Sequence, residues 1–107
     1  MYEYNDYLKI DDEIEYNKLS TEMDALLASI YFCKDNYTAQ IIIDKITELH
    51  IIRYAFVDLA NKTILHNNYE INDMCEIYIV EADFIIRDLR NRYNELNEGW
   101  EKWKNAL

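Results

Sequence analysis

The chain has no proline and a single glycine, Gly99, in 107 residues. Proline and glycine are the residues that most often interrupt helices and build tight turns. Their near absence favours a mostly helical body. Because 21 acidic residues face 11 basic ones, giving a net charge of −10, we expect that body to carry a strongly negative, solvated surface.

The length is that of one domain, and we treat residues 1–107 as a single acidic helical domain. No apolar run approaches the ~20 residues that a membrane span needs. The first residues carry two acids and no base before Lys9, unlike the basic start of a secretory signal. We therefore expect a cytoplasmic protein in which Cys33 and Cys75 are buried thiols rather than a disulfide.

The first predicted helix has an apolar stripe with the spacing of one helical face. The stripe consists of Leu19, Met23, Leu26, Leu27 and Ile30. Two starts are compatible with this helix. Ser20 or Thr21 could cap it, or a longer helix could begin at about Asp11, where three acids suit the positive end of a helix.

The second predicted helix follows a break at residues 35–36, and Thr38 is its expected cap. Its stripe consists of Ile42, Ile46, Leu49, Arg53, Phe56 and Leu59. Residues 36–68 carry three acids and three bases, whereas both flanking segments are acidic. This neutral, apolar helix is therefore expected to be the most enclosed. A small hairpin near residues 54–66 is the alternative.

The third predicted helix is long and follows an expected capping box that starts at Asn67. Its near-heptad stripe consists of Ile71, Met74, Cys75, Tyr78, Ala82, Ile85, Leu89, Tyr93, Leu96 and Trp100. Solubilising pairs are expected four residues apart, between Asp83 and Arg87 and between Asp88 and Arg92. The predicted fold is all-α, a three-helix or alternatively four-helix antiparallel bundle with a long C-terminal helix. The runner-up is α+β, with the hairpin near 54–66.

Catalytic and cofactor motifs are missing from the sequence. His50 and His66 lie in no metal-binding frame, so we expect structural or surface histidines and no metal. A single glycine does not supply the loops that cradle phosphate or an oxyanion, which predicts a non-enzyme without cofactor. The excess of acids also argues against direct binding of nucleic acid.

The N-terminal stretch interleaves aromatic residues with carboxylates. The predicted partner-binding residues there are Tyr4, Asp6, Tyr7, Asp11, Asp12, Glu13, Glu15 and Tyr16. Aromatic anchors and carboxylates together suit a basic groove that normally holds nucleic acid. The alternative is that Tyr7, Ile10 and Ile14 pack on the bundle while the acids are solvated.

Trp100 and Trp103 are three residues apart and share one side of the last helix. They are expected either to cap the core or to serve as a docking or dimer contact. We include both among the predicted partner-binding residues.

These features predict a non-catalytic inhibitor that binds a basic, nucleic-acid-binding surface of a host or cognate protein. In composition, though in no diagnostic motif, the chain resembles the small acidic inhibitors that phages make against bacterial defence systems, including anti-CRISPR proteins. Two alternatives stay open. One is an immunity or antitoxin protein. The other is a self-assembling helical module, such as a homodimer, that uses Trp100, Trp103 and the outer apolar positions Ile77, Val80 and Phe84.

Overall fold

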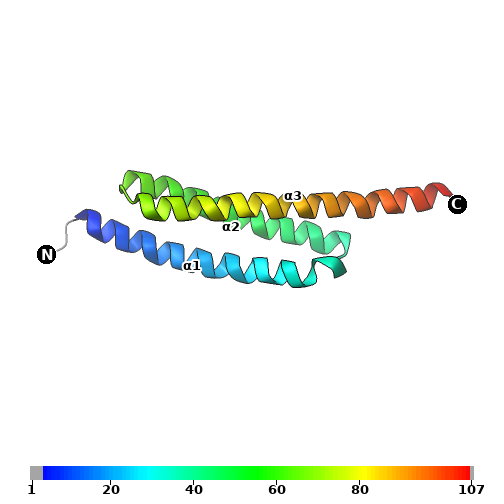
Figure 1. Cartoon of the computed structure of the whole chain (residues 1–107), viewed down its shortest axis with the longest axis horizontal. Helices are drawn as coiled ribbons and strands as arrows, with labels where there is room; N and C mark the ends of the chain where they lie inside the picture. Colours follow the sequence, from blue (N-terminus) through cyan, green and yellow to red (C-terminus); the bar gives the residue numbers. More distant parts are fainter. Residues whose placement is uncertain (1–3, 107) are drawn as a thin grey trace.

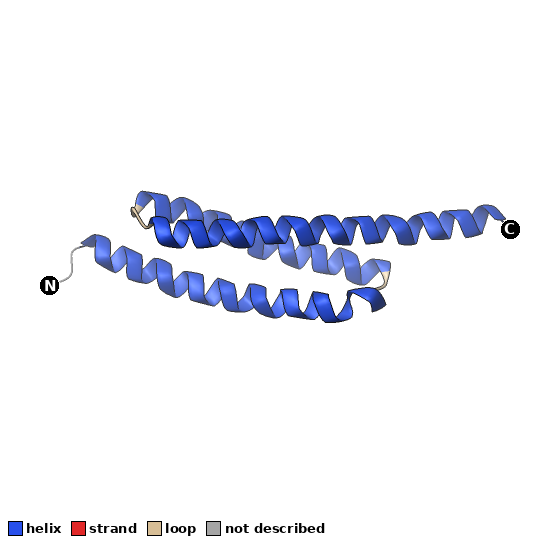
Figure 2. Ribbon diagram, viewed as in Figure 1, coloured by secondary structure: helices blue, strands red, loops and turns tan. Residues whose placement is uncertain are grey.

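A computed structural model describes residues 4–106 and the side chains of residues 6–97. Three long helices run antiparallel (Figure 1), α1 (Tyr4–Cys33), α2 (Ala39–Leu65) and α3 (Tyr69–Ala106), with one 3-10 turn, η1 (Lys34–Asn36), after α1. Within the described range there is no strand and no fourth α-helix (Figure 2). The all-α three-helix bundle is confirmed, and both the hairpin near 54–66 and the four-helix alternative are wrong.

Helix α1 begins at Tyr4, earlier than either predicted start. The side chains of Ser20 and Thr21 do not cap it, because each hydroxyl donates to the carbonyl of Asn17 one turn back in the helix. All five residues of the predicted stripe are buried. The buried face continues toward the N-terminus through Asp12 and Tyr16, and this packing supports the additional turns.

Helix α2 starts where the sequence predicts. The Thr38 side chain accepts a hydrogen bond of 3.3 Å from the backbone N–H of Ile41, which satisfies one of the free amides of the first turn. Phe56, Leu59 and Thr63 then keep the helical period and are fully buried. Burial at that spacing holds residues 54–65 in a helix instead of a hairpin.

The connection between α2 and α3 is a Schellman motif, a common way to end a helix. Asn67 has a positive φ of 56°, its N–H donates to Ile64 O, and the N–H of Asn68 donates to Thr63 O at 2.8 Å. The Asn67 side chain accepts from the Tyr69 hydroxyl. The predicted capping box is therefore wrong, since Asn67 terminates α2 and does not cap α3.

One ring from each helix meets in the core. The rings of Phe56 and Tyr78 are stacked with centroids 4.9 Å apart, and Tyr16 lies edge-on to Phe56 at 6.3 Å. The Tyr78 hydroxyl donates to Asp24 Oδ1 at 2.7 Å. Burial, followed by this hydrogen bond, raises the pKa of Tyr78. The aromatic junction ties all three helices together at one level.

Of the three helices, α2 packs most extensively against the other two, in agreement with the predicted order of enclosure, but its outer side stays uncovered. α2 packs more extensively against α3 than against α1, and it leaves apolar side chains exposed, including Ile51, Tyr54 and Leu65. The reason is geometric, because each helix of a three-helix bundle keeps one side toward solvent when no further element covers it.

The predicted ion pairs within α3 are also replaced. Asp83 accepts from Arg53 of α2 at 2.6 Å, and Asp88 pairs with Lys34 of η1 at 3.5 Å. Arg92 donates to Asp35 of η1 at 2.6 Å. In α3, the charged side chains of Asp83, Asp88 and Arg92 therefore form ion pairs with α2 and η1 and not with one another.

The two cysteines differ. Cys75 is fully buried, as expected, whereas Cys33 is exposed at the end of α1, and both are free thiols. Burial raises the pKa of Cys75 to about 11.

Beyond η1, the C-terminal part of α3 projects past the ends of α1 and α2 (Figure 1).

Candidate protein-binding surface

The N-terminal half of α1 presents an apolar stripe to solvent. Tyr7, Ile10 and Ile14 are exposed by 53%, 43% and 63%, and their spacing of three and four residues places them on one side of the helix. This side is opposite to the buried stripe of α1. The alternative that these three residues pack on the bundle is wrong.

Carboxylates border this stripe. Asp6, Asp11 and Glu13 are all exposed. By helical spacing, Asp6 and Glu13 lie along one edge of the stripe and Asp11 lies along the other. The outer side of α1 thus combines apolar contact area with negative charge at both edges.

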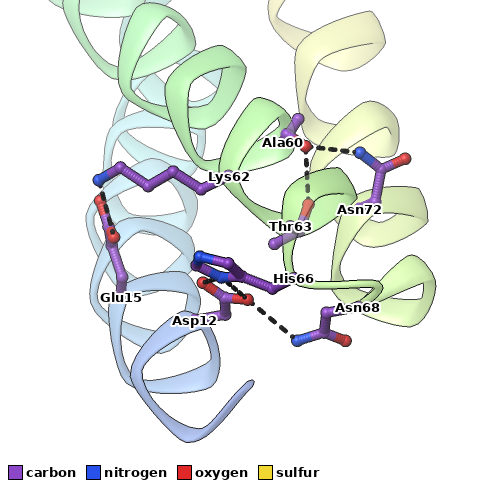
Figure 3. A network of polar contacts seen from close by, with 8 residues as sticks. All are labelled: Asp12, Glu15, Ala60, Lys62, Thr63, His66, Asn68 and Asn72. Atoms are coloured by element: carbon purple, nitrogen blue, oxygen red, sulfur yellow. Dashed lines mark hydrogen bonds and ion pairs between the residues drawn. The ribbon is translucent and has the colours of Figure 1, made fainter. Parts of the chain in front are cut away.

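Asp12 does not belong to this outer side, which corrects its predicted role. The residue is 2% exposed, and one carboxylate oxygen lies 2.9 Å from His66 Nδ1 in the α2–α3 connection (Figure 3). The Asn68 amide donates to the same oxygen at 3.4 Å. A buried carboxylate needs such partners, so Asp12 fastens α1 to the connection and is not available to another protein.

Tyr16 and Glu15 are also turned toward the bundle. Tyr16 lies in the aromatic junction, and burial raises its pKa. Glu15 forms an ion pair of 3.6 Å with Lys62 of α2 (Figure 3) and is half-buried. Tyr16 therefore does not lie on the outer side of α1, and Glu15 lies at the edge where α1 meets α2.

An open groove of about 440 Å³ lies between the N-terminal half of α1 and the start of α3. Its apolar lining comes from Ile10, Tyr16, Ile71 and Met74, and its charged and polar lining comes from Lys9, Glu13, Asn17, Asn68 and Glu70. The lining thus mixes polar and apolar side chains and includes two acids and one base. The groove opens beside the exposed stripe of α1, with which it shares Ile10.

The groove and the stripe suit a cationic partner chain. The aliphatic stem of a lysine or arginine can lie on apolar lining while its charged end reaches a carboxylate. Glu13 and Glu70, from two different helices, line the groove, and hydrogen bonds between a guanidinium and a carboxylate are among the stronger polar contacts. Glu70 was missed because it is close to Glu13 only after α1 and α3 have packed.

The remaining predicted site residues lie outside the described side chains. Tyr4 is the first residue of α1, and Trp100 and Trp103 lie in the projecting part of α3. Among the described side chains, no group of three or more His, Cys, Asp or Glu residues is arranged to hold a metal ion. The described helices also include none with the length and apolarity that a membrane crossing requires.

The chain matches no protein-family model, and we found no curated protein and no solved structure with detectable similarity to it. Inferences about function therefore depend on the surface of this molecule.

Proposed function

We propose that the chain is a non-catalytic inhibitor that binds a basic, nucleic-acid-binding surface of another protein through the outer side of α1 and the adjoining groove. We further propose that it acts in the cytoplasm, which its two free thiols favour. Given the compositional resemblance to phage inhibitors, a nuclease-based defence complex is the expected class of target.

One observation carries this proposal. Three large apolar side chains lie exposed on one side of α1, between Asp6 and Glu13 on one edge and Asp11 on the other. Large apolar side chains at the centre of an interface supply most of the binding free energy, and charges at the rim choose the partner. A partner surface with basic residues around an apolar patch would match this arrangement.

Charge also favours approach of such a partner. With a net charge of −10, the protein attracts cationic surfaces and repels nucleic acid, so it competes for a basic surface without binding the nucleic acid itself. Exposed charges more than about 8 Å apart are largely screened at physiological ionic strength. Association should therefore weaken as salt is raised.

The test is capture of binding proteins by the immobilised full chain from cells that contain the protein. We expect the captured protein to bind nucleic acid on its own and to release it when this chain is added. The double variant Asp11→Lys/Glu13→Lys should lose capture. The matched control is Asp44→Lys/Asp58→Lys, which changes two exposed acids of α2 and the net charge by the same amount.

Two outcomes would contradict the proposal. In the first, the α1 double variant captures the partner as well as the α2 double variant does. In the second, the captured protein has no affinity for nucleic acid, or keeps its nucleic acid when this chain binds. Recovery of a membrane-active toxin would instead support the immunity-protein alternative.

A further inference from the structure

Helix α3 carries a second stripe on the side opposite to its buried one. Asp73, Ile77, Val80, Phe84 and Arg87 recur at alternating spacings of four and three residues, the a/d repeat of helices that pair along their length. The three apolar members are exposed by 67%, 53% and 62%. A contiguous row of exposed apolar side chains along one helix marks a candidate contact surface for another chain.

The neighbouring helices of the same chain do not cover this stripe. On one edge of α3, Asp83 is held by Arg53 of α2. On the other edge, Glu81 accepts a hydrogen bond of 3.4 Å from Tyr31 of α1, and Asp88 pairs with Lys34. α1 and α2 thus occupy the two edges, and the stripe faces outward between them.

The charges at the two ends of the α3 stripe indicate which kind of partner can bind to it. Asp73 precedes the apolar centre and Arg87 follows it, each seven residues from Val80. Arg87 extends over the ring of Phe84, with its Cζ 5.9 Å from the ring centre. A stripe that is acidic at one end, basic at the other and apolar between is complementary to itself in the antiparallel direction.

We propose that two copies of this chain pair through α3 as an antiparallel, two-fold symmetric homodimer with Val80 at the axis. Asp73 of each copy then lies beside the second copy's Arg87, and Ile77 lies near the second copy's Phe84. A parallel pair would instead set Asp73 against Asp73 and Arg87 against Arg87. The five residues of this contact belong neither to the stripe on α1 nor to the lining of the groove, so the dimer does not depend on the proposed function.

The first test is sedimentation equilibrium of the full chain over a range of concentrations. We expect a dimer, and we expect Val80→Glu to raise the dimer dissociation constant at least about tenfold, because it brings two carboxylates together at the axis. Ile51→Glu is the matched control on α2, since Ile51 is exposed to a similar degree, 66%. It should dimerise like the unaltered chain.

The second test uses the charges and does not alter the apolar stripe. Asp73→Arg and Arg87→Asp should each weaken self-association, and an equimolar mixture of the two should form a heterodimer. The double variant Asp73→Arg/Arg87→Asp should dimerise again. Helix content by circular dichroism establishes that each variant is folded.

Orientation is tested by cross-linking in a Cys33→Ser background. A mixture of Ile77→Cys and Phe84→Cys chains should form a mixed disulfide faster than either variant forms one with itself. A monomer at every concentration would overturn the proposal, as would a Val80→Glu dimer of unchanged strength or faster pairing of like cysteines.

Discussion

At the scale of single residues, Asp12 shows how a carboxylate in an acidic segment can be structural. It is buried and accepts hydrogen bonds from the α2–α3 connection, whereas its neighbour Asp11 is exposed. The two acids are adjacent in sequence but point to different sides of α1. One belongs to the core and the other to the candidate binding surface.

This difference predicts unequal effects of two similar substitutions. Asp12→Ala should lower the free energy of unfolding by about 1–3 kcal/mol, because the buried Asn68 amide loses its acceptor. Asp11→Ala should change it by less than about 0.5 kcal/mol, as is usual for an exposed residue. Urea unfolding of both variants measures this. Equal losses would mean that the Asp12 contacts do not stabilise the fold.

The Cys75 thiol makes stability depend on alkaline pH. Burial, with smaller contributions from Asp12 and Glu15, raises its pKa from 9.0 to about 11. Between these values the unfolded chain holds fewer protons than the folded one, so the free energy of unfolding falls as pH rises. Below pH 9 this contribution is fully present. The raised pKa values of Tyr16, Tyr31 and Tyr78 act in the same direction.

We therefore expect denaturation curves recorded across pH 9–11 to show declining stability. In Cys75→Ala the free energy of unfolding should fall less steeply with pH over this range, because the titrating thiol has been removed. This expectation holds whatever the effect of the substitution at neutral pH. Cys33→Ala, which removes the exposed thiol, is the matched control. An identical slope for both variants would show that Cys75 does not contribute.

At the scale of elements, the end of α2 depends on one backbone conformation. Asn67 adopts a positive φ in the Schellman motif, a conformation that glycine and asparagine tolerate best. Asn67→Gly should leave the melting temperature unchanged, whereas Asn67→Val should lower the free energy of unfolding by about 1–2 kcal/mol. Asn61→Val, at an exposed helical position of α2, should have little effect. Thermal unfolding of the three variants checks this, and equal effects of both valines would contradict it.

Helix α1 shows why its start was hard to predict. Asp12, Tyr16, Leu19 and Met23 follow one helical spacing, and all four lie on the inner side. Asp12 stands at the first of these positions, and a carboxylate is normally expected at the surface. The buried stripe was therefore not predicted to continue as far as Asp12. The signal was present in the spacing but not in the residue type.

At the scale of the whole molecule, the two proposed contact surfaces lie on different helices, α1 and α3. Binding at each surface should respond differently to salt concentration. Binding of a cationic partner at α1 should weaken as salt rises, because screening reduces the attraction. Self-association through α3 should strengthen, since two copies of net charge −10 repel each other less. Partner titration and sedimentation equilibrium, each at low and high salt, measure the two responses. Responses in the same direction would contradict the assignment of a cationic partner to α1 and of a second, equally acidic copy to α3.

The sequence by itself indicated the all-α fold, the Thr38 cap and most of the buried positions, because helical spacing and capping act between residues a few positions apart. Leu96 is an exception, since it was predicted in the buried stripe of the third helix and is exposed. Only the tertiary structure decided which charged side chains are buried and which form hydrogen bonds or ion pairs with one another. Asp12 and His66 are separated by 54 residues, and Arg53 and Asp83 by 30. Such pairs depend on how whole helices align, and alignment is set by the packing of the entire core, including the aromatic junction of Tyr16, Phe56 and Tyr78.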